Sequence, residues 1–243
     1  MIQLKSCIRL LLNKVGYDVV RLGRNNDTLA DLLVNIFRDH SIQCVIDVGA
    51  NAGQYGRFLR NLGFDGHIVS FEPVHNVFVR LAEEAKGDPK WHCYNLALGD
   101  KPEDKKINVY SSTVFSSFLE ATDYAKGIWK SLEQNQEEVV SVVTLDDMRA
   151  EIEKVTGCSR FYLKLDTQGY DQQAFRGARA TMDKVAAMQT ELSMIHVYDG
   201  MPDPLDILKE FTYPGFSVAG MYPINRDESL AVIEFDCVLV RRN

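Results

Sequence analysis

The stretch that most limits how this chain can fold is residues 44–58, CVIDVGANAGQYGRF. It reads as a short buried strand that ends in an acid, Asp47, and is followed by a glycine-containing turn and a helix. A second apolar run, HIVSF at residues 67–71, is also followed by an acid, Glu72. Strand, acid, glycine turn, helix, strand and acid in this order build a nucleoside-binding crevice at the carboxyl ends of the strands of an α/β sheet.

The turn after the first strand does not fit a dinucleotide. The dinucleotide fingerprint is G-x-G-x-x-G, with a pyrophosphate on the helix N-terminus, whereas residues 47–53 read D-x-G-x-N-x-G. An acid at position 47 suits a cationic ligand instead, such as the ammonium or sulfonium of S-adenosylmethionine (SAM). Glu72 is placed to accept hydrogen bonds from two ribose hydroxyls. The alternative is an ordinary strand–helix turn whose glycines serve only packing.

The composition of the chain indicates which partners it can bind and in which compartment it functions. Of the 243 residues 46% are hydrophobic, which is enough for one large α/β core, and the formal net charge is −7. No long run of lysine and arginine is present in the sequence, so we expect no nucleic-acid partner. The five cysteines are scattered and form no zinc-binding pattern, which is typical of reduced thiols in a cytoplasmic protein.

The N-terminal part, residues 1–40, is predicted to be a helical segment that precedes a domain over residues 41–243. Residues 1–22 hold only a short apolar run, Ile8 to Leu12, which cannot span a bilayer, and no small-residue cleavage site follows it. We therefore expect no integral membrane segment. An amphipathic helix here would pack on the main domain or on a second subunit, giving a homodimer. The other interpretation is peripheral attachment to the inner face of a membrane.

Beyond residue 40, apolar strand-like runs alternate with helical patterns. We expect strands at residues 44–47, 67–71, 91–95, 161–165 and 186–192. Such alternation predicts a mainly parallel sheet that helices cover on both faces. Two last strands, 216–222 and 231–240, form a hairpin that adds an antiparallel strand. Further strands at 106–110 and 139–145 flank a polar segment, residues 111–138, which is a candidate substrate loop or lid.

Several motifs together resemble the FkbM family of SAM-dependent methyltransferases. They are VIDVGANAGQYG, SFEP, NLALGD, VVTLDD, FYLKLDTQGYDQQAFRGA, TELSMIHVYDG and FDCVLVR, and they cover most of residues 40–243. The resemblance implies a Rossmann-like class I methyltransferase fold, with a seven-stranded, mainly parallel sheet and an antiparallel C-terminal hairpin. It also implies transfer of a methyl group from SAM to a hydroxyl oxygen, with a sugar, glycan, glycolipid or other natural product as the acceptor.

The resemblance and the residue chemistry agree on the cofactor-binding residues. Those expected at the methionine end of SAM are Asp47, Gly49, Asn51, Gly53 and Tyr55. Glu72 is expected to hold the ribose hydroxyls. Asn95, Ala97 and Leu98 follow the third strand, where the adenine ring lies in this fold, although Leu98 equally suits the core of a strand.

Methyl transfer to a hydroxyl requires removal of its proton, because a neutral alcohol is a weak nucleophile. Asp166 and Glu191 lie at the ends of neighbouring predicted strands, and such ends lie about 5 Å apart in a parallel sheet. Two carboxylates that close can bind Mg²⁺ or another divalent cation, or one can act as a base whose pKa the other raises. Asp166 alone can also orient the ammonium of SAM. His196 is a further candidate base.

Lys164 is unusual inside an apolar strand, because a buried lysine needs a partner. Alternation places it on the same face as Asp166, so we expect an ion pair with Asp166 or Glu191, or a contact with the acceptor. The main hypothesis is therefore a SAM-dependent O-methyltransferase. The alternative is a non-catalytic SAM-binding or partner-binding module with the same fold, and the absence of G-x-G-x-x-G argues against an NAD-dependent oxidoreductase.

Overall fold

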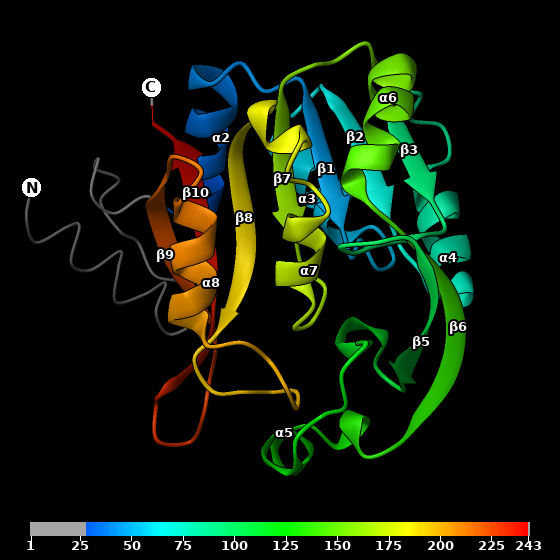
Figure 1. The fold of residues 1–243 in the computed structure, drawn as a ribbon, viewed down its shortest axis with the longest axis vertical. Coiled ribbons are helices and arrows are strands. Elements are labelled where there is room, and N and C mark those ends of the chain that lie inside the picture. The colour runs from blue at the N-terminus through cyan, green and yellow to red at the C-terminus, as the bar shows by residue number, and fades with distance from the viewer. Residues whose placement is uncertain (1–27, 243) are drawn as a thin grey trace, which may run out of the picture.

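The main sheet has seven strands in the spatial order β3-β2-β1-β7-β8-β10-β9 in the computed structural model, which describes residues 28–242 (Figure 1). The strands are β1 (Cys44–Val48), β2 (His67–Phe71), β3 (Trp91–Tyr94), β7 (Phe161–Leu165), β8 (Val185–Ser193), β9 (Phe216–Arg226) and β10 (Val232–Arg241). Neighbouring strands are parallel except where β10 pairs with β8 and β9. The predicted mainly parallel sheet with an antiparallel C-terminal hairpin is confirmed.

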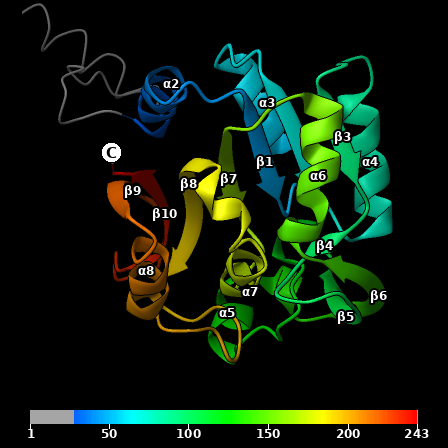
Figure 2. The same cartoon turned by 45° about the horizontal axis from the view of Figure 1, so that its top comes forward.

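Helices cover both faces of this sheet (Figures 1 and 2). On one face lie α2 (Leu29–Asp39), α3 (Gln54–Asn61) and α4 (His75–Ala85), and on the other lie α6 (Leu145–Thr156), α7 (Asp171–Arg176) and α8 (Pro204–Thr212). The core is divided in the same way, because successive strand residues point to opposite faces. Val45 packs among the residues of α2, α3 and α4, whereas Ile46 packs among those of α6, α7 and α8.

The central strands carry a row of polar residues within otherwise apolar sequence. Both β1 and β7 are buried along their whole length, as expected of parallel strands covered on both faces. Nevertheless Ser70, Asp47, Lys164 and Gln189 are partners in register on the four neighbouring strands β2, β1, β7 and β8. These four polar residues, one from each strand, form a row across the sheet near the carboxyl ends of the strands.

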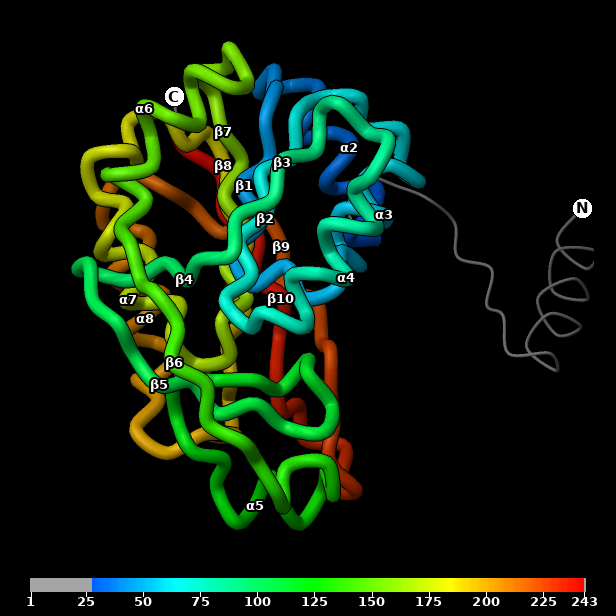
Figure 3. The backbone as a smooth tube through the Cα atoms, turned by 90° about the vertical axis from the view of Figure 1, so that its right-hand side faces the viewer, coloured from blue at the N-terminus to red at the C-terminus, as the bar shows by residue number. Residues whose placement is uncertain are grey.

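A second sheet of three strands, in the order β4-β6-β5, extends beyond that carboxyl end (Figure 3). Its strands are β4 (Ala97–Leu98), β5 (Glu103–Tyr110) and β6 (Asn135–Val143). Residues 111–134, which we call the cap, connect β5 to β6 and contain the short helices η1 (Thr113–Phe115), α5 (Asp123–Ile128) and η2 (Lys130–Leu132).

The expected boundaries around the cap need correction. The strand predicted at 139–145 instead begins at Asn135, within the segment that was expected to lack strands. The pairing that forms it is long-range, since Asn135 pairs with Tyr110. The strand also ends earlier, because the Thr144 hydroxyl accepts a hydrogen bond from the Asp147 amide and so begins α6 at Leu145.

The N-terminal predictions are tested only in part. The helix expected within residues 1–22 lies outside the described residues, so its packing, a homodimer and membrane attachment stay predictions. Helix α2 places Leu33, Ile36 and Phe37 in the core, while the division of the chain at residue 40 stays a prediction. Between residues 28 and 242 no helix is long and apolar enough to cross a membrane. Cys44, Cys93, Cys158 and Cys237 are free thiols.

Gly49→Ala is expected to destabilise the protein by about 2–5 kcal/mol. Gly49 has φ +80°, and an added Cβ would overlap the main-chain carbonyl oxygen of Asp166, so backbone strain and steric overlap act together. Gly63→Ala is the matched control, because φ there is +83° and nothing lies within 4 Å of an added Cβ. The control should lose only about 1–2 kcal/mol. Urea unfolding followed by circular dichroism measures both variants, and equal losses would contradict the role given to the Asp166 contact.

Candidate active site

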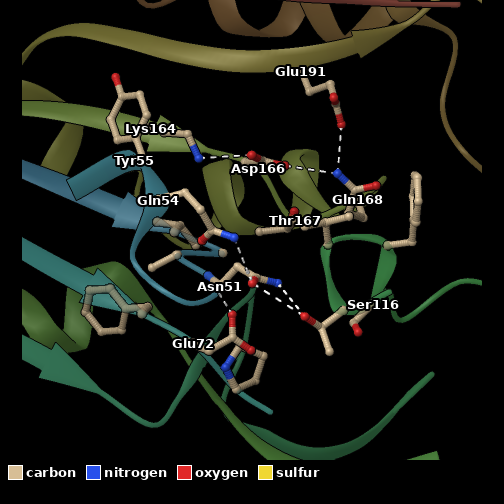
Figure 4. A pocket seen from close by; sticks show the side chains of 18 of the residues that line it. Asn51, Gln54, Tyr55, Glu72, Ser116, Lys164, Asp166, Thr167, Gln168 and Glu191 are labelled. Carbon is tan, nitrogen blue, oxygen red and sulfur yellow. Dashed lines mark hydrogen bonds and ion pairs between the residues drawn. The ribbon is translucent and has the colours of Figure 1, made fainter. Parts of the chain in front are cut away.

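A cavity of about 530 Å³ lies at the carboxyl ends of β2, β1, β7 and β8 (Figure 4). Its lining comes from the β1–α3 turn, the ends of these strands, β4, the cap and the β9–β10 hairpin. The volume is within the range of about 300–1,000 Å³ that is usual for small-molecule sites. Of the predicted site residues, those that line the cavity are Gly49, Asn51, Tyr55, Glu72, Ala97, Leu98, Lys164, Asp166 and Glu191.

The turn between β1 and α3 presents main-chain groups to the cavity. Gly49 (φ 80°), Asn51 (φ 46°) and Gly53 (φ 85°) all adopt left-handed backbone conformations, which glycine accepts without strain. The Asn51 amide nitrogen donates a 2.9 Å hydrogen bond to Glu72 Oε2, and its side-chain Nδ2 donates to Thr113 Oγ1 of the cap at 3.2 Å. Gly53 does not line the cavity but is the N-cap residue that directly precedes α3.

Glu72 is only 5% exposed and lines the cavity. Its two carboxylate oxygens each accept a 2.9 Å hydrogen bond from a main-chain amide, those of Asn51 and Val74. Burial raises the pKa of Glu72 to about 7, although these two amides oppose the increase. Each carboxylate oxygen keeps a second acceptor site, so the side chain can still accept hydrogen bonds from a pair of ligand hydroxyls.

Next to Glu72 the cavity wall is apolar. Ala97 and Leu98 line it together with Phe71, Ile107 and Phe118. Such a wall suits a flat heterocycle such as adenine. Asn95 does not line the cavity. Its Nδ2 donates to the carbonyl oxygens of Glu72 and Pro73, at 2.9 and 2.8 Å, and thereby holds the turn after β2.

Lys164 is buried, and two carboxylates and an aromatic ring surround its ammonium group. Its Nζ lies 3.0 Å from Asp166 Oδ2, 3.4 Å from Asp47 Oδ1 and 4.7 Å from the centre of the Tyr55 ring. Burial alone would lower the pKa of Lys164, but the carboxylates of Asp166 and Asp47 outweigh it and raise that pKa. The ammonium therefore stays protonated and can donate hydrogen bonds but cannot act as a base.

Asp47, which we expected at the methionine end of SAM, is not among the residues that line the cavity. It is 0% exposed and lies beneath the cavity, where it accepts from Lys164 at 3.4 Å and from the Ser70 hydroxyl at 3.4 Å. Register between β1 and β7 is the reason, because it sets Asp47 directly beside Lys164. The cation that Asp47 faces is therefore one of the chain's own.

The carboxylates of Asp166 and Glu191 are joined by an amide. Register between β7 and β8 brings them side by side, and Gln168 Nε2 lies 3.0 Å from Asp166 Oδ1 and 3.0 Å from Glu191 Oε2 (Figure 4). Burial, followed by the nearby charges of Asp166 and Glu234, raises the pKa of Glu191 well above its usual range. Within residues 28–242 Glu191 Oε1 has no hydrogen-bond partner, so one acceptor atom of this carboxyl is free.

This arrangement does not fit the divalent cation that was considered at Asp166 and Glu191. One oxygen of Asp166 contacts the Lys164 ammonium and the other accepts from the Gln168 amide. A metal ion would have to displace a cation and an amide donor, with only two carboxylates to hold it. No group of three or more histidine, cysteine or acidic side chains suited to a metal occurs in the described part of the chain.

His196 is not brought to the cavity. Strand β8 ends at Ser193 and the chain then turns outward, so that His196 is exposed. Its main-chain carbonyl accepts a hydrogen bond from the Thr122 hydroxyl at 3.1 Å. Because His196 is exposed and does not line the cavity, it is a weaker candidate base than Glu191.

Several polar residues of the cavity were not predicted from the sequence, namely Gln168, Gln189, Asn225, Glu234 and Asp236. Gln189 accepts from the Tyr55 hydroxyl at 2.9 Å and donates to Asp236 Oδ1 at 2.8 Å. A signal was present, since Glu234 and Asp236 alternate with apolar residues in VIEFDCVLV and so share one face of a strand. That pattern does not say which face meets the cavity.

The sequence matches the profile of one protein family. The sequence profile of the family described as "Methyltransferase FkbM domain" matches residues 47–218, which is more than half of the chain. No curated protein matches the sequence.

Solved structures give only distant similarity. A Klebsiella pneumoniae protein provisionally described as an O-methyltransferase is 9% identical, with 98% of this chain and 90% of that chain covered and a TM-score of 0.47. An uncharacterised Listeria monocytogenes serotype 4b protein is 9% identical over 92% and 69%, with a TM-score of 0.46. A Listeria monocytogenes protein provisionally described as a SAM-dependent methyltransferase is 6% identical over 87% and 100%, with a TM-score of 0.46. Similarity this low carries no conclusion about the acceptor.

Proposed function

Because this chain belongs to the FkbM methyltransferase family and has the Rossmann-like class I fold, it is a SAM-dependent methyltransferase, and we propose that it methylates a hydroxyl oxygen. The proposed acceptor is a sugar, or a glycan, glycolipid or natural product that carries such a hydroxyl. No metal takes part in the proposed reaction.

One observation carries this proposal: a single cavity holds Glu72 on one side and the contacts from Lys164 through Asp166 and Gln168 to Glu191 on another (Figure 4). The residues fit SAM, since Glu72 keeps free acceptor sites and an apolar wall lies beside it. Glu72 would hold the ribose hydroxyls, and Ala97 and Leu98 would contact the adenine. Asn51 and Gly49 would approach the methionine part. SAM supplies an electrophilic methyl group when it is bound.

The chain's own residues provide the proton transfer. In the proposed reaction Glu191 accepts the proton of the acceptor hydroxyl, because its raised pKa suits a base and its Oε1 is free. Lys164 keeps its charge and holds Asp166 in place through a 3.0 Å contact. Asp166 in turn fixes one end of the Gln168 amide that orients Glu191.

The wall on the β8–β10 side supports a neutral, hydroxyl-rich acceptor. Gln189, Asn225, Glu234 and Asp236 line it, and all of them can accept hydrogen bonds from hydroxyl groups. Among residues 28–242, Lys164 is the only lysine or arginine that lines the cavity. Its charge is already neutralised by Asp47 and Asp166. A phosphate or carboxylate on the acceptor would therefore be repelled.

The test is methyl transfer from isotopically labelled SAM to matched acceptors. Neutral methyl glycosides should be labelled and the corresponding uronic acids should not, and NMR of the product should place the new methyl group on oxygen. Chelation of metals with EDTA should leave the rate unchanged. Label on nitrogen or on a carboxylate, or a preference for the uronic acids, would contradict the proposal.

A further inference from the structure

Gln168 lies between the two carboxylates of the site and the cap, and the proposed reaction does not by itself explain its contacts with the cap. It is in the loop after β7 and has φ 53°, a left-handed conformation that a non-glycine residue adopts only at a cost. Every polar atom of its side chain has a partner within the described residues. The surrounding structure therefore holds this residue in a strained backbone conformation with a fixed side-chain orientation.

One end of the Gln168 amide faces the two carboxylates. An amide nitrogen carries two protons, and Nε2 lies 3.0 Å from Asp166 Oδ1 and 3.0 Å from Glu191 Oε2. Without that group, the carboxylate that follows β7 and the carboxylate within the neighbouring strand β8 would face each other directly and repel. Gln168 thus keeps them together while leaving Glu191 Oε1 free.

The other end of Gln168 faces the cap. The Tyr198 hydroxyl lies 2.9 Å from Gln168 Oε1 and 2.8 Å from the carbonyl oxygen of Phe115, and its single proton is shared between these two acceptors. Its main-chain carbonyl accepts from the Ser117 hydroxyl at 2.6 Å. Ser117 and Tyr198 are both 0% exposed, so these contacts are shielded from water.

Cap residues on both sides of Ser117 line the cavity. Phe115, Ser116 and Phe118 are part of its wall. Tyr198 pairs with Ala121 of the cap through a β-bridge. A shift of the cap would therefore disturb the Tyr198 and Ser117 contacts that hold Gln168.

We propose that Gln168 is a positioning residue that links the seating of the cap to the placement of Asp166 and Glu191. The inference rests on the proposed function, in which Glu191 is the base. When the cap is seated, Tyr198 and Ser117 hold Gln168, and Gln168 orients both carboxylates. When the cap is displaced, the amide loses its orientation and the carboxylates separate, so the base is assembled only beneath a seated cap.

The first test compares Gln168→Gly with Gln172→Ala. The glycine variant removes the amide, which costs stability because the two carboxylates then repel, but it also relieves the left-handed backbone, which offsets part of that cost. Gln172 is the matched control, because its amide donates to Glu210, outside the cavity lining. Gln168→Gly should lose about 10²-fold in kcat, with the SAM Kd and the acceptor KM little changed. The control should behave as wild type. An unchanged kcat, or a loss confined to KM, would overturn the inference.

A double-mutant cycle tests the link to the cap. Tyr198→Phe removes only the hydroxyl that reaches Gln168 and Phe115, and it should lower kcat about tenfold. In the Gln168→Gly background it should have no further effect, because the two residues act through one path. Losses that multiply would show that they act independently and would overturn the link.

Hydrogen exchange gives a readout that does not need turnover. The amides of Ser117 and Thr122 are bonded to Asn108 and Val197 respectively, and both should exchange faster in Gln168→Gly than in wild type. If the wild-type protein binds SAM but methylates no hydroxyl, the proposed function fails. Hydrogen exchange alone then tests whether Gln168 is linked to the cap. Unchanged exchange rates would then overturn it.

Discussion

Glu72→Ala is expected to weaken SAM binding by about 10²–10⁴-fold, the largest effect on affinity that we predict for any single substitution. The carboxylate is positioned by the amides of Asn51 and Val74 and would accept hydrogen bonds from both ribose hydroxyls. Hydrogen bonds to a charged group contribute about 1.5–3 kcal/mol each. Calorimetric titration with SAM and S-adenosylhomocysteine, with NAD as a non-ligand, measures the loss. Glu83→Ala is the matched control, because Glu83 is exposed and its side chain pairs with Lys86.

The pKa of Glu72 adds a pH dependence to the same measurement. Since that pKa is about 7 and the ionised form is the better acceptor, wild-type SAM affinity should rise about tenfold per pH unit below 7 and level off above it. The stability of the ligand-free protein changes with pH in the opposite direction. Because the pKa of Glu72 is about 7 in the folded protein and 4.5 in the unfolded chain, Glu72 stabilises the folded state fully below pH 4.5, and this stabilisation is lost as pH rises through about 7. The free energy of unfolding falls by about 3 kcal/mol over this range, at 1.36 kcal/mol per pKa unit. Glu72→Gln should flatten both profiles, and an affinity that does not change between pH 5 and 8 would contradict the role of Glu72.

Glu191→Gln is expected to lower kcat by about 10²–10⁴-fold, the contribution of a positioned general base. The amide keeps the size of the side chain but cannot accept the proton, so SAM affinity should stay close to wild type. Because burial and the neighbouring acids raise the pKa of Glu191, wild-type kcat should increase with pH on a limb whose midpoint lies above 4.5. The variant should lose this limb.

The control for this substitution is Glu228→Gln, because Glu228 is exposed in the β9–β10 turn. Single-turnover methyl transfer at several pH values measures all three proteins. Should Glu191→Gln retain wild-type kcat, the base would have to be another residue, and Asp166→Asn would be the next variant to measure.

Much of the fold could be predicted because its elements are specified locally. Strands β2 and β7 have the predicted limits, and Glu72 and Asp166 directly follow them as the hydrophobic pattern predicted. Glu191 lies within β8, two residues before its end, because β8 continues to Ser193. Other limits were wrong. Strand β6 was predicted at 139–145 and is Asn135–Val143, while β5 begins at Glu103 and β9 ends at Arg226 instead of at 106 and 222. Pairing between Asn135 and Tyr110 cannot be read from either segment alone.

Local sequence patterns were thus enough to predict the alternation of strands and helices, the left-handed turn after β1 and the acids at or near strand ends. What each polar group faces depends on how the strands are arranged in space. Strand register sets Lys164 against Asp47, the loop after β7 carries Gln168 between two carboxylates, β10 adds Glu234 and Asp236 to the cavity, and the turn after β8 leaves His196 outside it. This difference arises because hydrophobic periodicity acts over a few neighbouring residues, whereas the partner of a buried charge comes from whichever strand lies next to it in space.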